Sequence, residues 1–239
     1  NWDGLPGYDV EAHTIHLRSD QYANVTDIAQ LVNSKLLDAF FEARNGKFDQ
    51  EPELYSFADS RFTRTNSIEI AAADPSVKGR VVSFLLTTHS YFAKAAHGNI
   101  GFQTMSFCLD PVTMLPTLNE WFDDEDRAIA VMLAKVRSSL LSVTSANDEE
   151  PEESLLRPED VEQGVSSWGD LECFCVDEAS IEFYFAPYHV GSWAVGPQFA
   201  TVRYEDFAQL LKPKFAKMLD IEHLQRRRDE IRRLPDEDV

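Results

Sequence analysis

Three cysteines and six histidines are the residues in this 239-residue chain that could carry nucleophilic or metal chemistry. A nucleophilic pair would need a cysteine close to a histidine, and the sequence leaves open Cys175 with either His97 or His189. Only the presence of these residue types supports such a pair. The motifs of phosphate cradles, metalloproteases and hydrolase nucleophile elbows are absent. We therefore expect no catalytic residues and a protein that is not an enzyme.

The histidines show no metal-binding pattern. His13 and His16 are three positions apart on a predicted strand, where side chains alternate between faces, so we expect them to point in opposite directions. The other four histidines have no second ligand nearby in the sequence, and the cysteines lack the spacing of a structural zinc site. We expect neither a metal nor another cofactor.

The three cysteines leave two alternatives open. Cys173 and Cys175 are two positions apart in "LECFCVD" and so share one face of a predicted strand. Such neighbours rarely bond to each other, but either could reach Cys108 on another strand. The chain therefore has either three buried free thiols or one disulfide and a spare thiol.

Two aromatic loops punctuated by glycines are better candidates for a binding site. The stretch "FYFAPYHVGSWAVGPQF" (183–199) begins as a strand, which must end where Pro187 cannot donate to a ladder. Pro187 and Pro197 stiffen the ends of the loop while Gly191 and Gly196 permit tight turns, so the loop loses little entropy on binding.

Tyr and Trp are the residues that anchor interfaces, so we predict that residues 186–197 form the binding loop. A second loop, within 88–107, carries His97-Gly98-Asn99 between two strands. The predicted partner-binding residues are Pro187, Tyr188, His189, Ser192, Trp193, His97 and Asn99. The alternative is that Tyr188 and Trp193 fold back over the edge of the sheet.

Hydrophobic periodicity predicts an α+β fold with mainly antiparallel strands and helices packed on one face. A helix over 26–44 should bury Ile28, Val32, Leu36 and Phe40, and a helix over 124–142 should bury Ile129, Leu133, Val136 and Leu140. Strands are predicted over 12–18, 67–73, 80–92, 101–109, 171–177, 181–186 and 199–203. A long charged helix is predicted over 215–234, and an acidic loop over 145–153.

The net charge of −19 is concentrated before residue 212. Residues 212–239 carry eight Lys/Arg and seven Asp/Glu, so the first 211 residues hold 14 basic and 34 acidic side chains, a balance of −20. Such a surface repels nucleic acid and attracts a basic partner. The sequence contains no apolar run of membrane-spanning length and begins without a secretion signal, so we expect either a cytoplasmic protein or one whose signal or anchor lies outside this sequence.

Two stretches resemble the RsiV-like family of extracytoplasmic domains. They are "SYFAKAAHGN" with "FQTMSFCLD" and "LPTLNEWF", and "IEFYFAPYHVGSWAVGPQFATVRYEDFAQLL". The family includes sensor domains of anti-sigma factors, accessory domains of polysaccharide deacetylases and a secreted mycobacterial immunogenic protein. The chain departs from the family pattern at Ala95-Ala96, where glycines are usual, and at 177–180, which lacks the usual Asp-Gly.

The resemblance implies an N-terminal α/β partner domain (1–95), an RsiV-like domain (96–212) and a C-terminal helical extension (213–239). It also implies an RsiV-like fold and a non-catalytic, extracytoplasmic domain that binds a protein at the cell envelope. In RsiV-like proteins that partner is lysozyme, a basic enzyme. The deacetylase-associated relatives imply an alternative, a cell-wall glycan-binding module; an uncharacterised hydrolase is a third.

Overall fold

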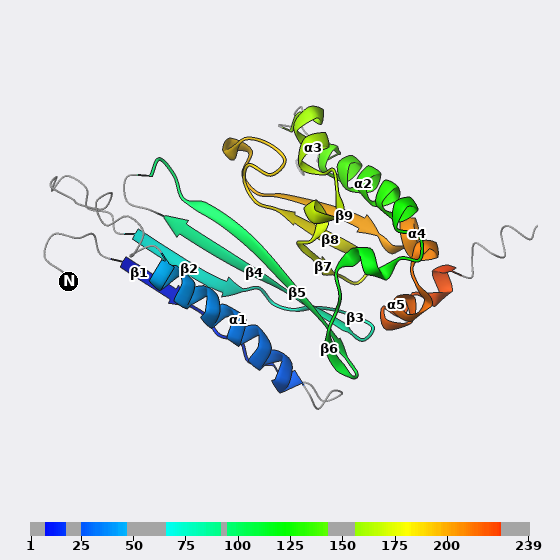
Figure 1. Cartoon of the computed structure of the whole chain (residues 1–239), viewed down its shortest axis with the longest axis horizontal. Helices are drawn as coiled ribbons and strands as arrows, with labels where there is room; N and C mark the ends of the chain where they lie inside the picture. The colour runs from blue at the N-terminus through cyan, green and yellow to red at the C-terminus, as the bar shows by residue number, and fades with distance from the viewer. Residues whose placement is uncertain (1–7, 18–24, 47–65, 92–94, 143–155, 226–239) are drawn as a thin grey trace, which may run out of the picture. The chain divides into compact units, whose positions relative to one another are not determined.

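The computed structural model describes residues 8–17, 25–46, 66–91, 95–142 and 156–225, which form two sheets and the helices around them (Figure 1). The first sheet has the order β1-β2-β4-β5-β6, with β3 paired to β4, and the second has the order β7-β8-β9. β1 and β2 pair in parallel, whereas β2–β4, β3–β4, β5–β6, β7–β8 and β8–β9 are antiparallel. The strands are β1 (Tyr8–Ala12), β2 (Asn66–Ala72), β3 (Ser76–Lys78), β4 (Val81–Tyr91), β5 (Asn99–Leu109), β6 (Val112–Met114), β7 (Phe174–Val176), β8 (Ser180–Phe185) and β9 (Gln198–Arg203).

The α-helices are α1 (Val25–Gly46), α2 (Glu125–Leu141), α3 (Pro158–Gly164), α4 (Tyr204–Phe207) and α5 (Pro213–Met218). Short 3-10 helices occur at η1 (Leu118–Trp121), η2 (Trp168–Leu171), η3 (Trp193–Val195) and η4 (Ala208–Leu210). The chain forms two compact units, residues 1–74 with 84–103 and residues 75–83 with 104–239. Unlike the predicted domains 1–95 and 96–212, these units are discontinuous in sequence, because β4 and β5 each contribute residues to both.

In the first unit, α1 lies against β1 and β2 (Figure 1). It buries one apolar stripe there. Ile28, Val32 and Leu36 are fully buried, as their spacing predicts. The side chain of Asn33 holds the segment after β1 by accepting from the Ile15 N–H (2.8 Å) and donating to the Ile15 carbonyl (2.9 Å). These two hydrogen bonds satisfy the backbone N–H and carbonyl of Ile15, which lies outside the sheet.

In the second unit, α2 packs on β9, and the inner face of the β7–β8–β9 sheet supplies much of the core. Phe183, Phe185 and Val202 lie in that core and alternate with more exposed residues along their strands. Trp121 is completely buried, stacked on Phe215 at a centroid distance of 5.1 Å. The segment after the second sheet therefore belongs to the same core.

Hydroxyl side chains hold the outer edge of β7. The Phe174 N–H donates to Thr104 Oγ1 (3.1 Å) and the Val176 N–H donates to Ser83 Oγ (3.1 Å). Ser83 is 1% exposed, and its hydroxyl also bonds that of Ser106 at 2.7 Å. Backbone donors that a neighbouring strand would otherwise satisfy are thus satisfied by side chains far away in the sequence.

Three predictions about elements need correction. The strand predicted over 12–18 is wrong, because β1 ends at Ala12 and residues 13–17 leave the sheet toward Asn33. The opposite-face argument for His13 and His16 therefore does not apply. In α2, Val136 and Leu140 are buried as predicted. The rest of the buried stripe is Ala128 and Met132, while Ile129 and Leu133 lie at its flank, partly buried.

The third correction concerns the long helix predicted over 215–234. Helix α5 ends at Met218, and Asp220 adopts a left-handed conformation with φ of 57°. This break lets Leu219 and Ile221 enter the core, where they are at most 1% exposed. Residues 226–234 of the predicted helix, the side chain of Phe40 and the loop over 145–153 lie outside the described parts.

Candidate functional site

The loop 186–197 joins β8 to β9 and is closed at its base by the pairing of Phe185 with Gln198. The strand ends just before Pro187, as expected. The chain then turns through a hydrogen bond from the His189 N–H to the Ala186 carbonyl (3.1 Å). Tyr188 lies inside that turn with φ of 73°, a left-handed conformation that is unfavourable for any residue with a Cβ. The surrounding structure therefore holds Tyr188 in a strained pose.

The middle of the loop is fastened to the core. Val190 is 1% exposed and belongs to the main hydrophobic cluster. A Cβ added at Gly164, the last residue of α3, would lie 2.1 Å from the His189 carbonyl oxygen, so the loop backbone packs directly on that helix end. Gly191 is similarly confined, because an added Cβ would lie 2.9 Å from both Leu156 Cδ2 and Val195 Cγ2. The loop backbone therefore packs against the rest of the second unit and does not project freely into solvent.

Three large aromatic side chains in the loop 186–197 and at the start of β9 are exposed. Tyr188 is 64% exposed, Trp193 is 36% exposed and Phe199 is 51% exposed. Phe199 lies on the outer face of β9 and packs edge-to-face on Tyr184, with ring centroids 5.6 Å apart. Ser192 is also exposed, whereas Pro187 is partly buried.

Phe199 was not predicted as a site residue. The signal for it was the alternation along β9, where Phe199 shares the outward phase with Thr201 and Arg203 while Ala200 and Val202 point inward. An aromatic residue on the polar face of a strand is the kind of exposed apolar group that can mark an interaction surface.

His189 is exposed, but less so than Tyr188. Its ring packs edge-to-face on Phe185 at 5.2 Å, and its Nε2 lies 3.7 Å from Asp170 Oδ1. The His189 side chain is 35% exposed. His189 therefore contributes to the base of the loop.

Asp170 organises the turn beneath the loop. Its carboxylate accepts hydrogen bonds from the backbone N–H and the hydroxyl of both Ser166 and Ser167, at 2.9–3.0 Å. Burial alone would raise the pKa of Asp170, but these hydrogen bonds outweigh it, and the pKa lies below its ordinary value. The carboxylate is thus ionised at neutral pH beside His189.

His97 and Asn99 belong to the first unit, whereas the five predicted residues of the loop belong to the second. Asn99 is exposed at the start of β5. His97 is partly buried, and its Nδ1 lies 2.9 Å from the Gly98 carbonyl oxygen. The predicted set therefore divides into one group of residues in each unit.

The three cysteines are free thiols in the structure. Cys175 is buried at 4% exposure, and burial, followed by the charge of Cys173, raises the pKa of its thiol to about 12 despite a hydrogen bond with Tyr184. Burial likewise raises the pKa of Cys173 to about 11. Both thiols are therefore protonated at neutral pH, which is unfavourable for a nucleophile.

No hydrogen bond joins Cys175 to His189, although the structure describes both residues. The groups around Cys175 are Cys173, Tyr184 and Glu182, and the Tyr184 hydroxyl donates to Glu182 Oε2 at 3.0 Å. His97 lies in the other unit. The raised pKa values of Cys173 and Cys175 show that neither of these two thiols is activated in this arrangement.

Two features are absent from the described residues. No three His, Cys, Asp or Glu side chains among them are placed to hold a metal ion. In the same parts of the chain, every helix is too short or too polar to cross a membrane.

Comparison with known proteins identifies similar folds. No family model matches the chain, and no curated protein matches it. A DUF3298-family protein from Bacteroides fragilis is similar in structure, with a TM-score of 0.52 and 17% identity over 80% of this chain and 73% of that chain. A DUF3298-family protein from Pseudomonas aeruginosa gives a TM-score of 0.44 and 11% identity over 62% of this chain and 63% of that chain.

DUF3298 is the designation of the RsiV-like domain family, to which the sequence motifs show a resemblance. The likeness to the B. fragilis protein confirms the predicted α+β fold, with a mixed, mostly antiparallel sheet and packed helices. At 17% identity, this similarity shows a similar fold and nothing more specific.

Proposed function

We propose that this chain is a non-catalytic, extracytoplasmic binding domain that recognises a basic, lysozyme-like protein at the cell envelope through the loop 186–197. The observation that carries the proposal is the pose of Tyr188, which is 64% exposed and held in a left-handed turn. Strained residues that the surrounding structure holds in place often occur at functional sites.

The loop has the physical properties of a preorganised interface. Val190 and the contact of His189 with Gly164 fasten its backbone, so binding would order little that is not already ordered. Tyr188 and Trp193 each offer a large amphipathic side chain with few rotatable bonds, and such residues dominate interface energetics.

The charge of the chain favours a basic partner. A balance of −20 over the first 211 residues would steer a cationic protein toward this surface over roughly a Debye length of 8 Å at physiological salt. Lysozyme is the partner of the RsiV-like proteins that the sequence motifs resemble, and it is basic. An aromatic or hydroxyl tip such as Tyr188 could enter its sugar cleft.

Titration calorimetry with a c-type lysozyme tests the proposal. Truncation in Tyr188→Ala should weaken binding by about 2 kcal/mol, as for a hot-spot aromatic, and Trp193→Ala should weaken it less. Tyr188→Gly separates contact from strain, because glycine accepts the left-handed φ and should increase stability relative to Tyr188→Ala without restoring binding.

Wild-type protein that fails to bind at low salt would exclude lysozyme as the partner. Equal affinity of the wild type and the three variants would show that the loop is only structural.

The glycan-binding alternative is supported by the exposed aromatic rings of Trp193 and Phe199, because sugars stack on such rings. A pull-down with peptidoglycan, repeated after saturation with lysozyme, distinguishes the two. Capture that lysozyme does not compete, and that Tyr188→Ala does not affect, would favour the glycan. Turnover of a peptide, ester or polysaccharide substrate that is lost in Cys175→Ala would contradict the non-catalytic assignment.

A further inference from the structure

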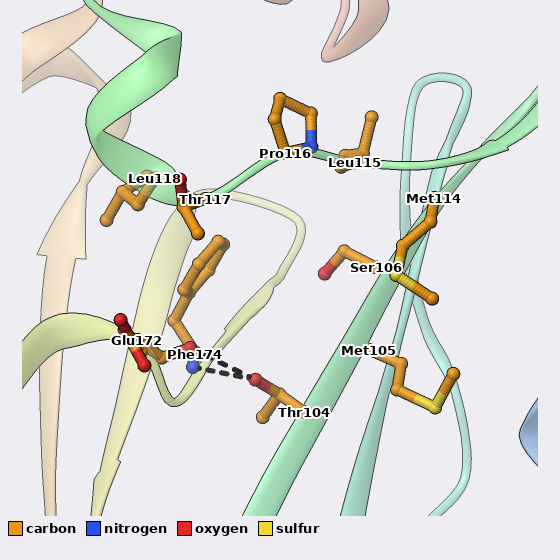
Figure 2. A pocket seen from close by; sticks show the side chains of 10 residues that line it. All are labelled: Thr104, Met105, Ser106, Met114, Leu115, Pro116, Thr117, Leu118, Glu172 and Phe174. Carbon is orange, nitrogen blue, oxygen red and sulfur yellow. Dashed lines mark hydrogen bonds between the residues drawn. The ribbon is translucent and has the colours of Figure 1, made fainter. Parts of the chain in front are cut away.

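A second candidate site lies away from the loop, in a pocket of about 220 Å³ within the second unit (Figure 2). The pocket lies between β5, the segment 114–118 that begins with the last residue of β6, and the start of β7. Its apolar wall includes Leu115, Leu118 and Phe174, and Met114, which is 54% exposed, also lines it. No residue of the loop 186–197 lines it.

The volume sets the size of the ligand. A cavity of about 150 Å³ holds a benzene ring, and pockets for drug-sized molecules begin at about 300 Å³. A volume of about 220 Å³ therefore suits one large side chain and is too small for a dinucleotide cofactor or an oligosaccharide.

The hydroxyl groups of the pocket already have partners. Thr104 Oγ1 accepts from the Phe174 N–H, as described above, and lies 3.4 Å from the Glu172 carbonyl oxygen. The Thr117 hydroxyl donates to Glu120 Oε1 at 3.2 Å, and the Ser106 hydroxyl is bonded to that of Ser83. These groups serve the fold, so they contribute little polar recognition of a ligand.

The carboxylate of Glu172 is different. Glu172 is exposed at the pocket, and its carboxylate forms no hydrogen bond or ion pair with a residue that the structure describes. No lysine, arginine or histidine lines the pocket. An apolar cavity with one uncompensated carboxylate is complementary to a ligand with an apolar stem and a cationic end.

We propose that this pocket receives a long basic side chain, arginine or lysine, from a protein partner. The stem of that side chain packs on Met114, Leu115 and Phe174 while its cation pairs with Glu172. One ion pair near the surface and one buried stem bind weakly by themselves, so the occupant needs the further contacts that a protein surface supplies. The site does not depend on the proposed loop interface, and either can fail without the other.

The test is a two-dimensional ¹H–¹⁵N NMR titration of the full 239-residue chain with capped tripeptides. The probes are acetyl-Gly-Arg-Gly-amide, its lysine analogue and its citrulline analogue, which keeps the shape of arginine without the charge. The two cationic peptides should give saturable shifts at the amides of Leu115, Thr117 and Phe174, and the citrulline peptide should bind at least about threefold more weakly.

Three variants make the test specific. Glu172→Gln should raise the Kd of the arginine peptide by about threefold to fivefold. Glu178→Gln, which makes the same charge change at an exposed position outside the pocket, should leave the Kd unchanged. Met114→Trp replaces the linear methionine side chain with a bulky indole ring at the pocket and should abolish the localised shifts. Because Met114 is exposed, this variant should keep its fold.

Several outcomes would overturn the proposal. Equal effects of Glu172→Gln and Glu178→Gln, or shifts spread over the whole acidic surface, would show nonspecific attraction. Binding of the citrulline peptide as tight as that of the arginine peptide would remove the role of the carboxylate. Free arginine binding better than the capped peptide would indicate a small-molecule site. Concentration-dependent self-association that Met114→Trp abolishes would assign the pocket to a second copy of this chain.

Discussion

Replacing Gly164 by alanine tests whether α3 fastens the loop 186–197. The added Cβ would lie 2.1 Å from the His189 carbonyl oxygen, 3.0 Å from its carbonyl carbon and 3.1 Å from Val190 Cγ1. An ordinary contact is at least 3.4 Å, so the loop backbone would have to move by more than 1 Å. Val190 is buried in the core, so this movement would disturb packing as well as the loop.

We expect Gly164→Ala to lower the free energy of unfolding by about 2 kcal/mol, the usual effect of overpacking. For a chain of this size that corresponds to a Tm lower by roughly 4–8 °C. Thermal and urea unfolding measure the stability, and hydrogen exchange measures the loop directly: the amides of residues 188–191 should exchange faster. Binding of the lysozyme-like partner should weaken although Tyr188 is unchanged.

Gly169→Ala is the matched control, because the nearest atom to its added Cβ is Ser167 Oγ at 3.5 Å, an ordinary contact. This variant should stay within about 0.5 kcal/mol of the wild type. Equal Tm values for the two variants, with unchanged exchange in the loop, would refute the inference that the loop is fastened to the end of α3.

Three further outcomes are expected. Asp170→Asn should lower stability at neutral pH by about 1 kcal/mol, as for a lost helix cap. Because the folded pKa of Asp170 lies below its unfolded value, the stabilisation is present above the unfolded pKa and is lost as the pH falls through the folded one, so the difference between the urea melts of the two proteins should shrink as the pH is lowered through that range. Cys175, with its pKa raised to about 12, should resist iodoacetamide at pH 8 until urea unfolds the chain, as peptide mass spectrometry would show; rapid native alkylation would contradict its burial. Ser83→Ala should lower the free energy of unfolding by about 1–3 kcal/mol, because the buried Val176 N–H loses its acceptor; a neutral effect would mean that water replaces the hydroxyl.

The local elements of this protein could be predicted from its sequence. Helix α1 was predicted with the correct buried face at Ile28, Val32 and Leu36, because a stripe at helical spacing depends only on neighbours along the chain. The strands over 181–186 and 199–203, and the end of the first of them before Pro187, were also predicted from local sequence patterns. The mixed order of the predicted strands and helices gave the α+β fold, which the structural comparison confirmed.

The tertiary structure decided how these elements use their side chains. In α2 both neighbouring stripes are apolar, and packing on the second sheet selected Ala128 and Met132 over Ile129 and Leu133. The long helix predicted over 215–234 is interrupted at Asp220, whose left-handed conformation accompanies the burial of both Leu219 and Ile221 in the core.

The candidate sites show the same division. Sequence composition predicted an aromatic loop stiffened by prolines, but only the fold buries Val190, turns His189 toward Asp170 and leaves Tyr188 exposed. The pocket beside Glu172 has no sequence pattern, because its walls come from segments up to 70 residues apart along the chain, as the bond between Phe174 and Thr104 shows. Periodicity reports which residues share a face of an element, whereas a site requires the contacts that the faces make with each other, and those form only when the whole core is packed.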